Sequence, residues 1–313
     1  MIYNQERKMQ FIQERKQKAT ISNNIENIFE LSSEIEVSYG RDLCEWTSNE
    51  IISFYKYYST ASVQSLVQLH NALTMYTNWC IMNGMVSDNQ NHYTEINSVM
   101  LCSCVNFVAL RKMMVSRDEL LELLKELPNY SDMFILLGLF EGIPAKQGCM
   151  FNIKVSDIHG NELTLPDGNI VVISDELKHI MHVAAEEETH TSLPNKKKDF
   201  EYEYTDGDHV LRHIKRNSVR PNEVLVIGSR MRKCADYLDM PGLTIKALQE
   251  SGRMWEISKI MKRNGVSLDD AVIKYRSEHE AIYGPMQNTV TYINTYGVLI
   301  KEMYVDKIVD KLD

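Results

Sequence analysis

The sequence lacks a hydrophobic run long enough to cross a membrane. Its longest apolar stretches, Met133–Phe140 and Val99–Leu110, are short or interrupted by polar residues, whereas a spanning helix needs about 20 apolar residues. The first residues also lack a basic segment followed by an apolar one, which is the pattern of an export signal. We therefore expect a cytoplasmic protein that makes no membrane contact.

Cysteines are few, and they lack the paired short spacings of a zinc site or a small disulfide scaffold. The six stand at Cys44, Cys80, Cys102, Cys104, Cys149 and Cys234. This spacing fits neither a zinc site nor a disulfide framework, so we expect buried thiols. His179 and His182 lie three residues apart on one predicted helix, but two ligands do not make a zinc site. The sequence predicts no metal and no cofactor.

Positive charge is scarce in the chain as a whole. The formal net charge is −9, from 34 Lys and Arg against 43 Asp and Glu, and phosphate binding needs local positive charge. The distribution changes this first impression, because residues 196–263 carry 15 basic and 10 acidic side chains. Residues 209–233 hold seven basic side chains with Glu223 as their one acidic neighbour. This segment is a candidate for contact with phosphates.

The length of 313 residues, with 44% hydrophobic and 25% charged residues, predicts about two globular domains. Residues 1–21 resemble a basic helical arm, which we interpret as solvated or in contact with DNA or a neighbouring subunit. Residues 22–114 show apolar spacing of three and four, typical of a helical domain. Residues 115–313 form the second predicted domain. The expected fold class is mainly α with a small β-hairpin or sheet (α+β).

Local signals place several elements. Thr47 and Glu50 form a capping box, Ser62 begins the helix Val63–Asn83, and Ser116 with Glu119 opens the second domain. The remaining expected elements are helices at 118–126, 131–140, 147–153, 174–188, 243–264, 268–281 and 297–312, a hairpin at 162–173 around Pro166-Asp167-Gly168, and a loop at 195–208. Glu186-Glu187-Glu188 is interpreted as a solvated helix end.

Two parts of the chain resemble the tyrosine recombinases, the family of the phage integrases. Residues 134–158 keep the frame of that family's first catalytic arginine: an apolar helix, a glycine turn, a second apolar helix and Ser156-Asp157-Ile158. The first domain resembles the integrase core-binding domain through Asp42-Leu43, Trp46-Thr47, Ser62-x-x-Ser65-Leu66, Tyr76-x-x-Trp79-Cys80 and Asn83-Gly84. The resemblance implies a helical core-binding domain followed by a catalytic-type domain.

The catalytic groups of that family are largely missing. Such enzymes need a tyrosine nucleophile, two arginines, a lysine on the hairpin and histidine-type groups. Pro144 stands where the first arginine should, and a shifted frame offers Ala145 or Lys146, while the hairpin 162–173 contains no lysine. Lys246 to Gln249 is the best positional match to the His-x-x-Arg box, and both types are replaced. His209 and Arg212 match the spacing of the His-x-x-Arg box, but they precede a basic loop and do not lie within the expected helix. The nucleophile would be Tyr283, with Tyr275 or Tyr292 as substitutes.

One lost oxyanion donor costs about 10²–10³ in rate, and groups that act as a unit fail together. We also find no nucleophile elbow and no phosphate-binding lysine loop. We therefore predict a protein that is not an enzyme. The alternative of an active, divergent recombinase using Tyr283 stays open.

The chain most resembles catalytically degenerate integrase-fold repressors of lysogeny in SPbeta-type Bacillus phages. This implies a cytoplasmic, nucleoid-associated regulator that binds a double-stranded DNA operator, with a regulatory phage protein as a further candidate partner and an open oligomeric state. The candidate DNA contacts are Arg212, Lys215, Arg216, Arg220, Arg230, Arg232, Lys233, Lys146, Lys246, Arg253, Ser62, Gln64 and Ser65. A third hypothesis is a protein-interaction module on an integrase fold, supported by the net acidity and the amphipathic tail.

Overall fold

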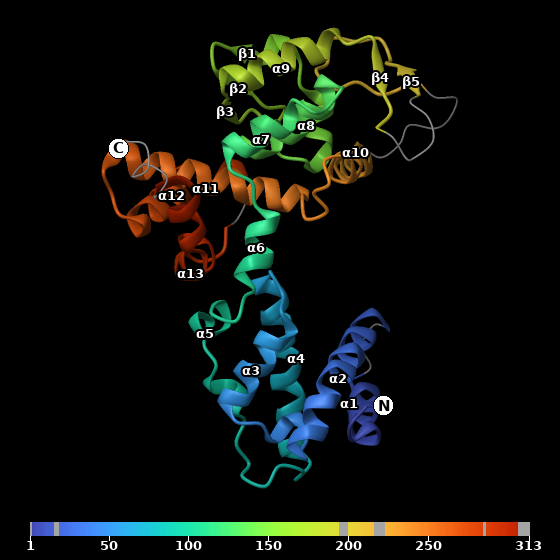
Figure 1. Cartoon of the computed structure of the whole chain (residues 1–313), viewed down its shortest axis with the longest axis vertical. Coiled ribbons are helices and arrows are strands. Elements are labelled where there is room, and N and C mark those ends of the chain that lie inside the picture. Colours follow the sequence, from blue (N-terminus) through green and yellow to red (C-terminus); the bar gives the residue numbers. More distant parts are fainter. Residues whose placement is uncertain (1, 16–18, 194–199, 216–222, 284–285, 306–313) are drawn as a thin grey trace. The chain divides into compact units, whose positions relative to one another are not determined.

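The chain folds into two compact units, Met1–Leu110 and Arg111–Asp313, each described here by itself. Figure 1 shows the computed structural model, which describes residues 2–15, 19–193, 200–215, 223–283 and 286–305. Helices dominate both units, and the described strands are short. The expected class, mainly α with a small β-sheet, is confirmed. In the described part of the chain, no helix combines the length and the apolar character that a membrane span requires.

The first unit is built from helices joined by short 3-10 turns (Figure 1). Its elements are α1 (Gln5–Glu14), α2 (Ala19–Tyr39), α3 (Ser48–Tyr58), α4 (Val63–Met82), α5 (Ser98–Cys102), the 3-10 turns Leu43–Glu45 and His92–Glu95, and α6 (Phe107–Met113), which continues into the second unit. The capping box of Thr47 and Glu50 begins α3, and the Ser62 hydroxyl accepts a hydrogen bond from the Ser65 amide at the start of α4. These predicted helix starts are confirmed.

The expected solvated arm is in part a core helix. Phe11 on α1 is 1% exposed, and its ring contacts those of Phe29, Tyr76 and Trp79 at centroid distances of 6.3, 5.2 and 5.6 Å. Lys8 is fully buried, with its Nζ 2.5 Å from Glu36 Oε2. A buried ammonium group needs such a partner, so for Lys8 the prediction of a solvated or DNA-contacting side chain was wrong. Lys16 and Lys18 lie outside the described residues.

The second unit begins with helices and a three-stranded antiparallel sheet (Figure 1). Its first elements are α7 (Arg117–Leu124), α8 (Tyr130–Phe140), the 3-10 helices Lys146–Asn152 and Val155–Asp157, β1 (Ile158–His159), β2 (Glu162–Thr164), β3 (Ile170–Val172) and α9 (Asp175–Glu186). Strand β2 pairs with β3 through Leu163 opposite Val171. The predicted hairpin and the helix that Ser174 caps are confirmed.

The remainder of the second unit contains three elements that sequence patterns missed. Strands β4 (Thr189–Thr191) and β5 (Glu201–Glu203) pair with each other, so the expected loop at 195–208 contains a strand. Helix α10 (Glu223–Tyr237) was not among the helices expected from the sequence. Helices α11 (Ile245–Asn264), α12 (Leu268–Tyr283) and α13 (Thr289–Ile300) follow, and a π-helical turn, Lys301–Val305, ends the described part. The predicted tail helix thus starts earlier than expected.

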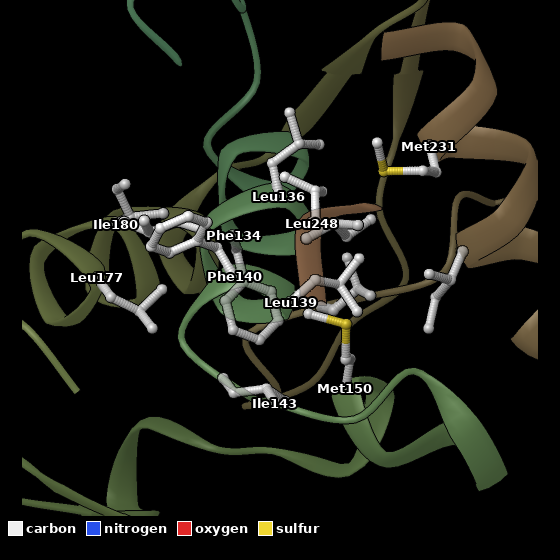
Figure 2. Packing of buried hydrophobic residues seen from close by; sticks show 14 of the residues in the cluster. Phe134, Leu136, Leu139, Phe140, Ile143, Met150, Leu177, Ile180, Met231 and Leu248 are labelled. Carbon is white, nitrogen blue, oxygen red and sulfur yellow. The ribbon is translucent and has the colours of Figure 1, made fainter. Parts of the chain in front are cut away.

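Helix α8 is the centre of the second unit. Most of its residues are buried, and α9, α10 and α11 all contact it. Figure 2 shows Phe134, Leu139 and Phe140 of α8 among side chains from its neighbours, including Ile180 and Leu248. A helix that is apolar all round must be covered on every side, which explains why three helices surround it.

Gly252 on α11 allows the backbone of that helix to touch α8. A Cβ atom at this position would lie 1.7 Å from the carbonyl oxygen of Phe140 and 2.7 Å from its carbonyl carbon. Any larger residue would therefore force the two helices apart. The contact joins two helices that are adjacent in space but more than a hundred residues apart in the sequence.

We predict that Gly252→Ala destabilises the second unit by roughly 3 kcal/mol, because a clash with a fixed backbone cannot relax by rotation of a side chain. Urea denaturation followed by circular dichroism measures the change. Gly228→Ala on α10 is the matched control, since a Cβ there meets nothing within 4 Å. That variant should gain about 0.5–1 kcal/mol from helix propensity. Equal stability of the two variants would contradict the close contact.

Candidate functional site

A pocket lies where the end of α8 and the turn after it meet α11 and α12. We call it the Pro144 pocket. Its lining residues are Leu139, Phe140, Gly142, Pro144, Gln249, Gly252, Arg253, Glu256 and Tyr275. The Gly252 contact with Phe140 holds two of its walls together. The pocket combines an apolar floor with a few polar side chains, which is typical of binding sites.

The pocket brings together two positions to which the resemblance to the tyrosine recombinases assigns catalytic arginines. Pro144 stands at the expected first arginine, and Gln249 stands at the arginine of the His-x-x-Arg box. Proline has no amide donor and glutamine carries no charge. Lys246, at the histidine position of that box, is exposed on the first turn of α11. Pro144 and Gln249 line the same pocket, and neither side chain can pair with phosphate as arginine does.

Arg253 is the arginine that lines this pocket. Its Nη1 donates a hydrogen bond to Glu250 Oε1, with 2.7 Å between the two atoms. The side chains are 12% and 11% exposed. Burial raises the pKa of Glu250, against the opposing effects of Arg253 and Lys246. The arginine that remains in the pocket is therefore already in contact with a carboxylate.

The remaining polar groups around the pocket are also paired or buried. Glu256 lines the pocket and accepts a hydrogen bond from Lys259, whose Nζ lies 3.9 Å from the centroid of the Trp255 ring. Tyr275 lines the pocket and is 2% exposed, while Tyr292 is fully buried. Burial raises the pKa of Tyr292 well above its ordinary value. Tyr283 ends α12, but its side chain lies outside the described residues.

Lysines are absent from the described strands of the three-stranded sheet. Lys178 reaches the turn between β1 and β2 from α9, with its Nζ 3.1 Å from Asn161 Oδ1. Lys146 begins the 3-10 helix after Pro144, and its side chain lies outside the described residues. Among described residues, histidine, cysteine and acidic side chains form no group of three or more able to hold a metal ion. His179 is exposed, with its ring 6.2 Å from that of Tyr130.

Two family models match the chain. One, described as "MrpR, C-terminal catalytic domain", matches residues 114–294, and the other, "MrpR, N-terminal core-binding domain", matches residues 2–82. The chain belongs to the MrpR family. It is also similar to the SPbeta prophage-derived uncharacterized protein YopR of Bacillus subtilis (strain 168), with 24% identity over 292 residues that cover 85% of this chain and 87% of that protein. The predicted tyrosine-recombinase-like fold is thereby confirmed.

In this MrpR-family chain, Arg230 lies inside the catalytic-type domain. It is 7% exposed, and its Nε donates to Asp132 Oδ1 at 2.7 Å while its Nη2 donates to the Ser131 hydroxyl at 2.6 Å. Burial alone would raise the pKa of Asp132, but Arg230 and His190 outweigh it and hold that pKa at about 2. The expectation of a phosphate contact at Arg230 needs correction, because its guanidinium is engaged in the interior.

Arg212 is half-buried and contacts two residues that hydrogen-bond to Ser131. Its Nη2 donates to the backbone carbonyl of Glu187, and its guanidinium lies 5.1 Å from the centroid of the Tyr204 ring. The Tyr204 hydroxyl shares a hydrogen bond with Ser131. Glu187 accepts hydrogen bonds from the amides of residues 130 and 131 at the start of α8. Glu187 is therefore a helix cap, and its interpretation as a solvated helix end was wrong.

The other candidate cations divide into exposed and paired residues. Arg232 and Lys233 are exposed on α10. Lys215 is exposed and lies 3.0 Å from Glu203. Arg216 and Arg220 lie outside the described residues. Within the described part of the chain, only some of the basic side chains of residues 209–233 are thus exposed and without an acidic neighbour.

The core-binding domain carries the remaining candidates at the start of α4. The Ser62 hydroxyl caps the helix through the Ser65 amide at 3.2 Å, so capping explains Ser62. Gln64 is exposed, and Ser65 is half-buried. Gln64 is the member of this group whose side chain faces solvent most fully, and amide side chains are suited to reading adenine.

We predict that Asp132→Asn destabilises the catalytic-type domain by about 3–5 kcal/mol, because it leaves the buried Arg230 without its counterion. The lowered pKa of Asp132 also makes the stability of the wild-type domain depend on pH. The stabilisation is fully present above the ordinary carboxyl pKa of 3.8 and is lost as the pH falls through about 2. Thermal unfolding between pH 2 and 7 measures both effects. The exposed Asp236→Asn on α10 is the control and should leave the profile unchanged.

Proposed function

We propose that this chain is a sequence-specific double-stranded DNA-binding protein, a catalytically inactive recombinase-like repressor that maintains lysogeny of a prophage. In this proposal residues 22–114 form the core-binding domain and residues 115–313 a degenerate catalytic domain. The observation that carries it is the Pro144 pocket, in which proline and glutamine occupy positions where a recombinase would hold arginines. The prophage origin of the similar protein YopR supports the phage context.

A protein can lose catalytic residues and still bind DNA phosphates more readily than it can lose phosphate binding and still catalyse cleavage. Cleavage needs several groups acting together on one phosphorus atom, whereas duplex binding is a sum of separate phosphate and base contacts. The exposed Arg232, Lys233 and Lys246 can supply such contacts from α10 and the start of α11. Gln64 is a candidate for base recognition in the core-binding domain. A protein of this kind represses by occupying an operator.

We predict that the full-length protein, mixed with fragments of its own prophage and host genome, selects fragments sharing a sequence motif. Sequencing of the bound fraction measures the enrichment. If no motif is enriched while a protein partner is captured, the DNA-binding proposal is overturned in favour of a protein-interaction role.

The DNA fragments selected in this way can be used to measure how much α10 contributes to phosphate binding. Replacing Arg232 and Lys233 together by alanine should flatten the dependence of log K on log salt by about 1.8, that is, about 0.9 for each phosphate that the protein no longer neutralises. Lys125→Ala is the control, because that exposed side chain pairs with Glu122 on α7. A slope that the double substitution on α10 does not change would place the phosphate contacts elsewhere.

A divergent recombinase is the second candidate, since Tyr275 lines the same pocket as Arg253. We expect no covalent adduct with a nicked duplex that traps the tyrosine intermediate, because the pocket lacks two arginines. Denaturing electrophoresis of the labelled duplex gives the result. An adduct in the wild-type protein that disappears in Tyr283→Phe or Tyr275→Phe would identify the nucleophile and reject the inactive assignment.

A further inference from the structure

Arg253 faces the Pro144 pocket with its guanidinium already bound. Glu250 precedes it by one helical turn on α11, and Oε1 of that glutamate accepts from Arg253 Nη1 at 2.7 Å. A guanidinium recognises carboxylate and phosphate with the same planar set of donors. A phosphate entering the pocket therefore meets a site where a carboxylate is already present.

Glu250 is an unusual residue for the interior of this helix. It is 8% exposed, and its second oxygen, Oε2, is buried with no hydrogen-bond partner in the described structure. The hydroxyl of Tyr292 is likewise buried with no hydrogen-bond partner in the described structure. A buried carboxylate oxygen without a donor costs free energy. Glu250 is thus poorly explained as a stabilising residue, because it brings charge into the core and satisfies only one of its oxygens.

We infer that Glu250 is an internal competitor that occupies Arg253 and limits how strongly the Pro144 pocket holds a DNA phosphate. The inference rests on the proposed function, because it assigns to Glu250 the control of one contact in that DNA complex. Glu256 also lines this pocket, but its carboxylate is paired with Lys259. Because of Glu250, the pocket favours DNA less than its arginine alone would.

The test uses full-length protein and a mixed-sequence duplex at several salt concentrations. Glu250→Gln keeps the shape of the side chain and removes the charge that competes for Arg253. We expect about tenfold tighter binding, the order of one charge-assisted hydrogen bond gained. The salt dependence should steepen by about 0.9, because Arg253 then neutralises one more phosphate.

Matched variants separate this effect from a change in net charge. Glu122→Gln removes the same charge from another pair of residues three apart, Glu122 and Lys125, whose side chains are 73% and 68% exposed. It should leave the affinity within about twofold, as expected for a screened surface pair. In an Arg253→Gln background, Glu250→Gln should lose most of its effect. Glu250→Leu is the second variant where Glu250→Gln does not fold.

The outcomes distinguish the two proposals. Wild-type protein that binds no DNA at low salt overturns the proposed function together with this inference. Wild-type protein that binds DNA, with Glu250→Gln no tighter than Glu122→Gln, overturns this inference alone. Failure of both Glu250 variants to fold makes Glu250 a structural residue and also rejects the inference. Tighter binding that requires Arg253 supports it.

Discussion

The contact of Gly252 with the Phe140 carbonyl oxygen is the constraint on which the second unit depends. It fixes how closely α11 approaches the end of α8, with no room for a Cβ atom. The chain after Phe140 must turn at once, and Gly142 does so with a φ of 98°, a conformation that favours glycine. Pro144 follows two residues later and lines the pocket together with residues of α11. The pocket is therefore a consequence of close helix packing, and it persists whether or not its residues carry out chemistry.

Polar groups hold α8 at both ends, and a buried carboxylate within the helix explains the position of Arg230. Glu187 caps its start, and Glu141 at its other end accepts from the amide and hydroxyl of Ser174, at 2.8 and 2.6 Å. Asp132 adds a carboxylate to a helix that is otherwise buried among apolar residues. That charge requires a cation, because an unpaired buried carboxylate is too costly. The buried Arg230 supplies this cation.

Sequence patterns predicted elements whose signals are local. The caps at Thr47 and Ser174 and the hairpin around Pro166 depend on neighbouring residues, and the structure confirms them. The ion pair of Asp132 and Arg230 spans 98 residues, so charge density along the chain could not reveal it. One signal was present: a lone aspartate in the apolar helix around Ile135 implies a distant cation. The short strands β4 and β5 were missed because β4 contains no apolar residue, and the three residues of β5 are too few to establish an alternating pattern.

Arg212 and Arg230 bind other residues of the protein, and this affects how an acidic chain could bind DNA in the proposed function. Of the cations counted in residues 209–233, Arg230 serves the interior, Arg212 binds a backbone carbonyl and Lys215 lies beside a glutamate. With a net charge of −9, few of the described cations in this segment remain for phosphate contacts in the proposed DNA complex, and non-specific binding depends almost entirely on such contacts. Discrimination must then come from base contacts or duplex shape. In the proposed role as a repressor, weak binding to bulk DNA would leave more protein for the operator. Partial occupation of Arg253 by Glu250 acts in the same direction.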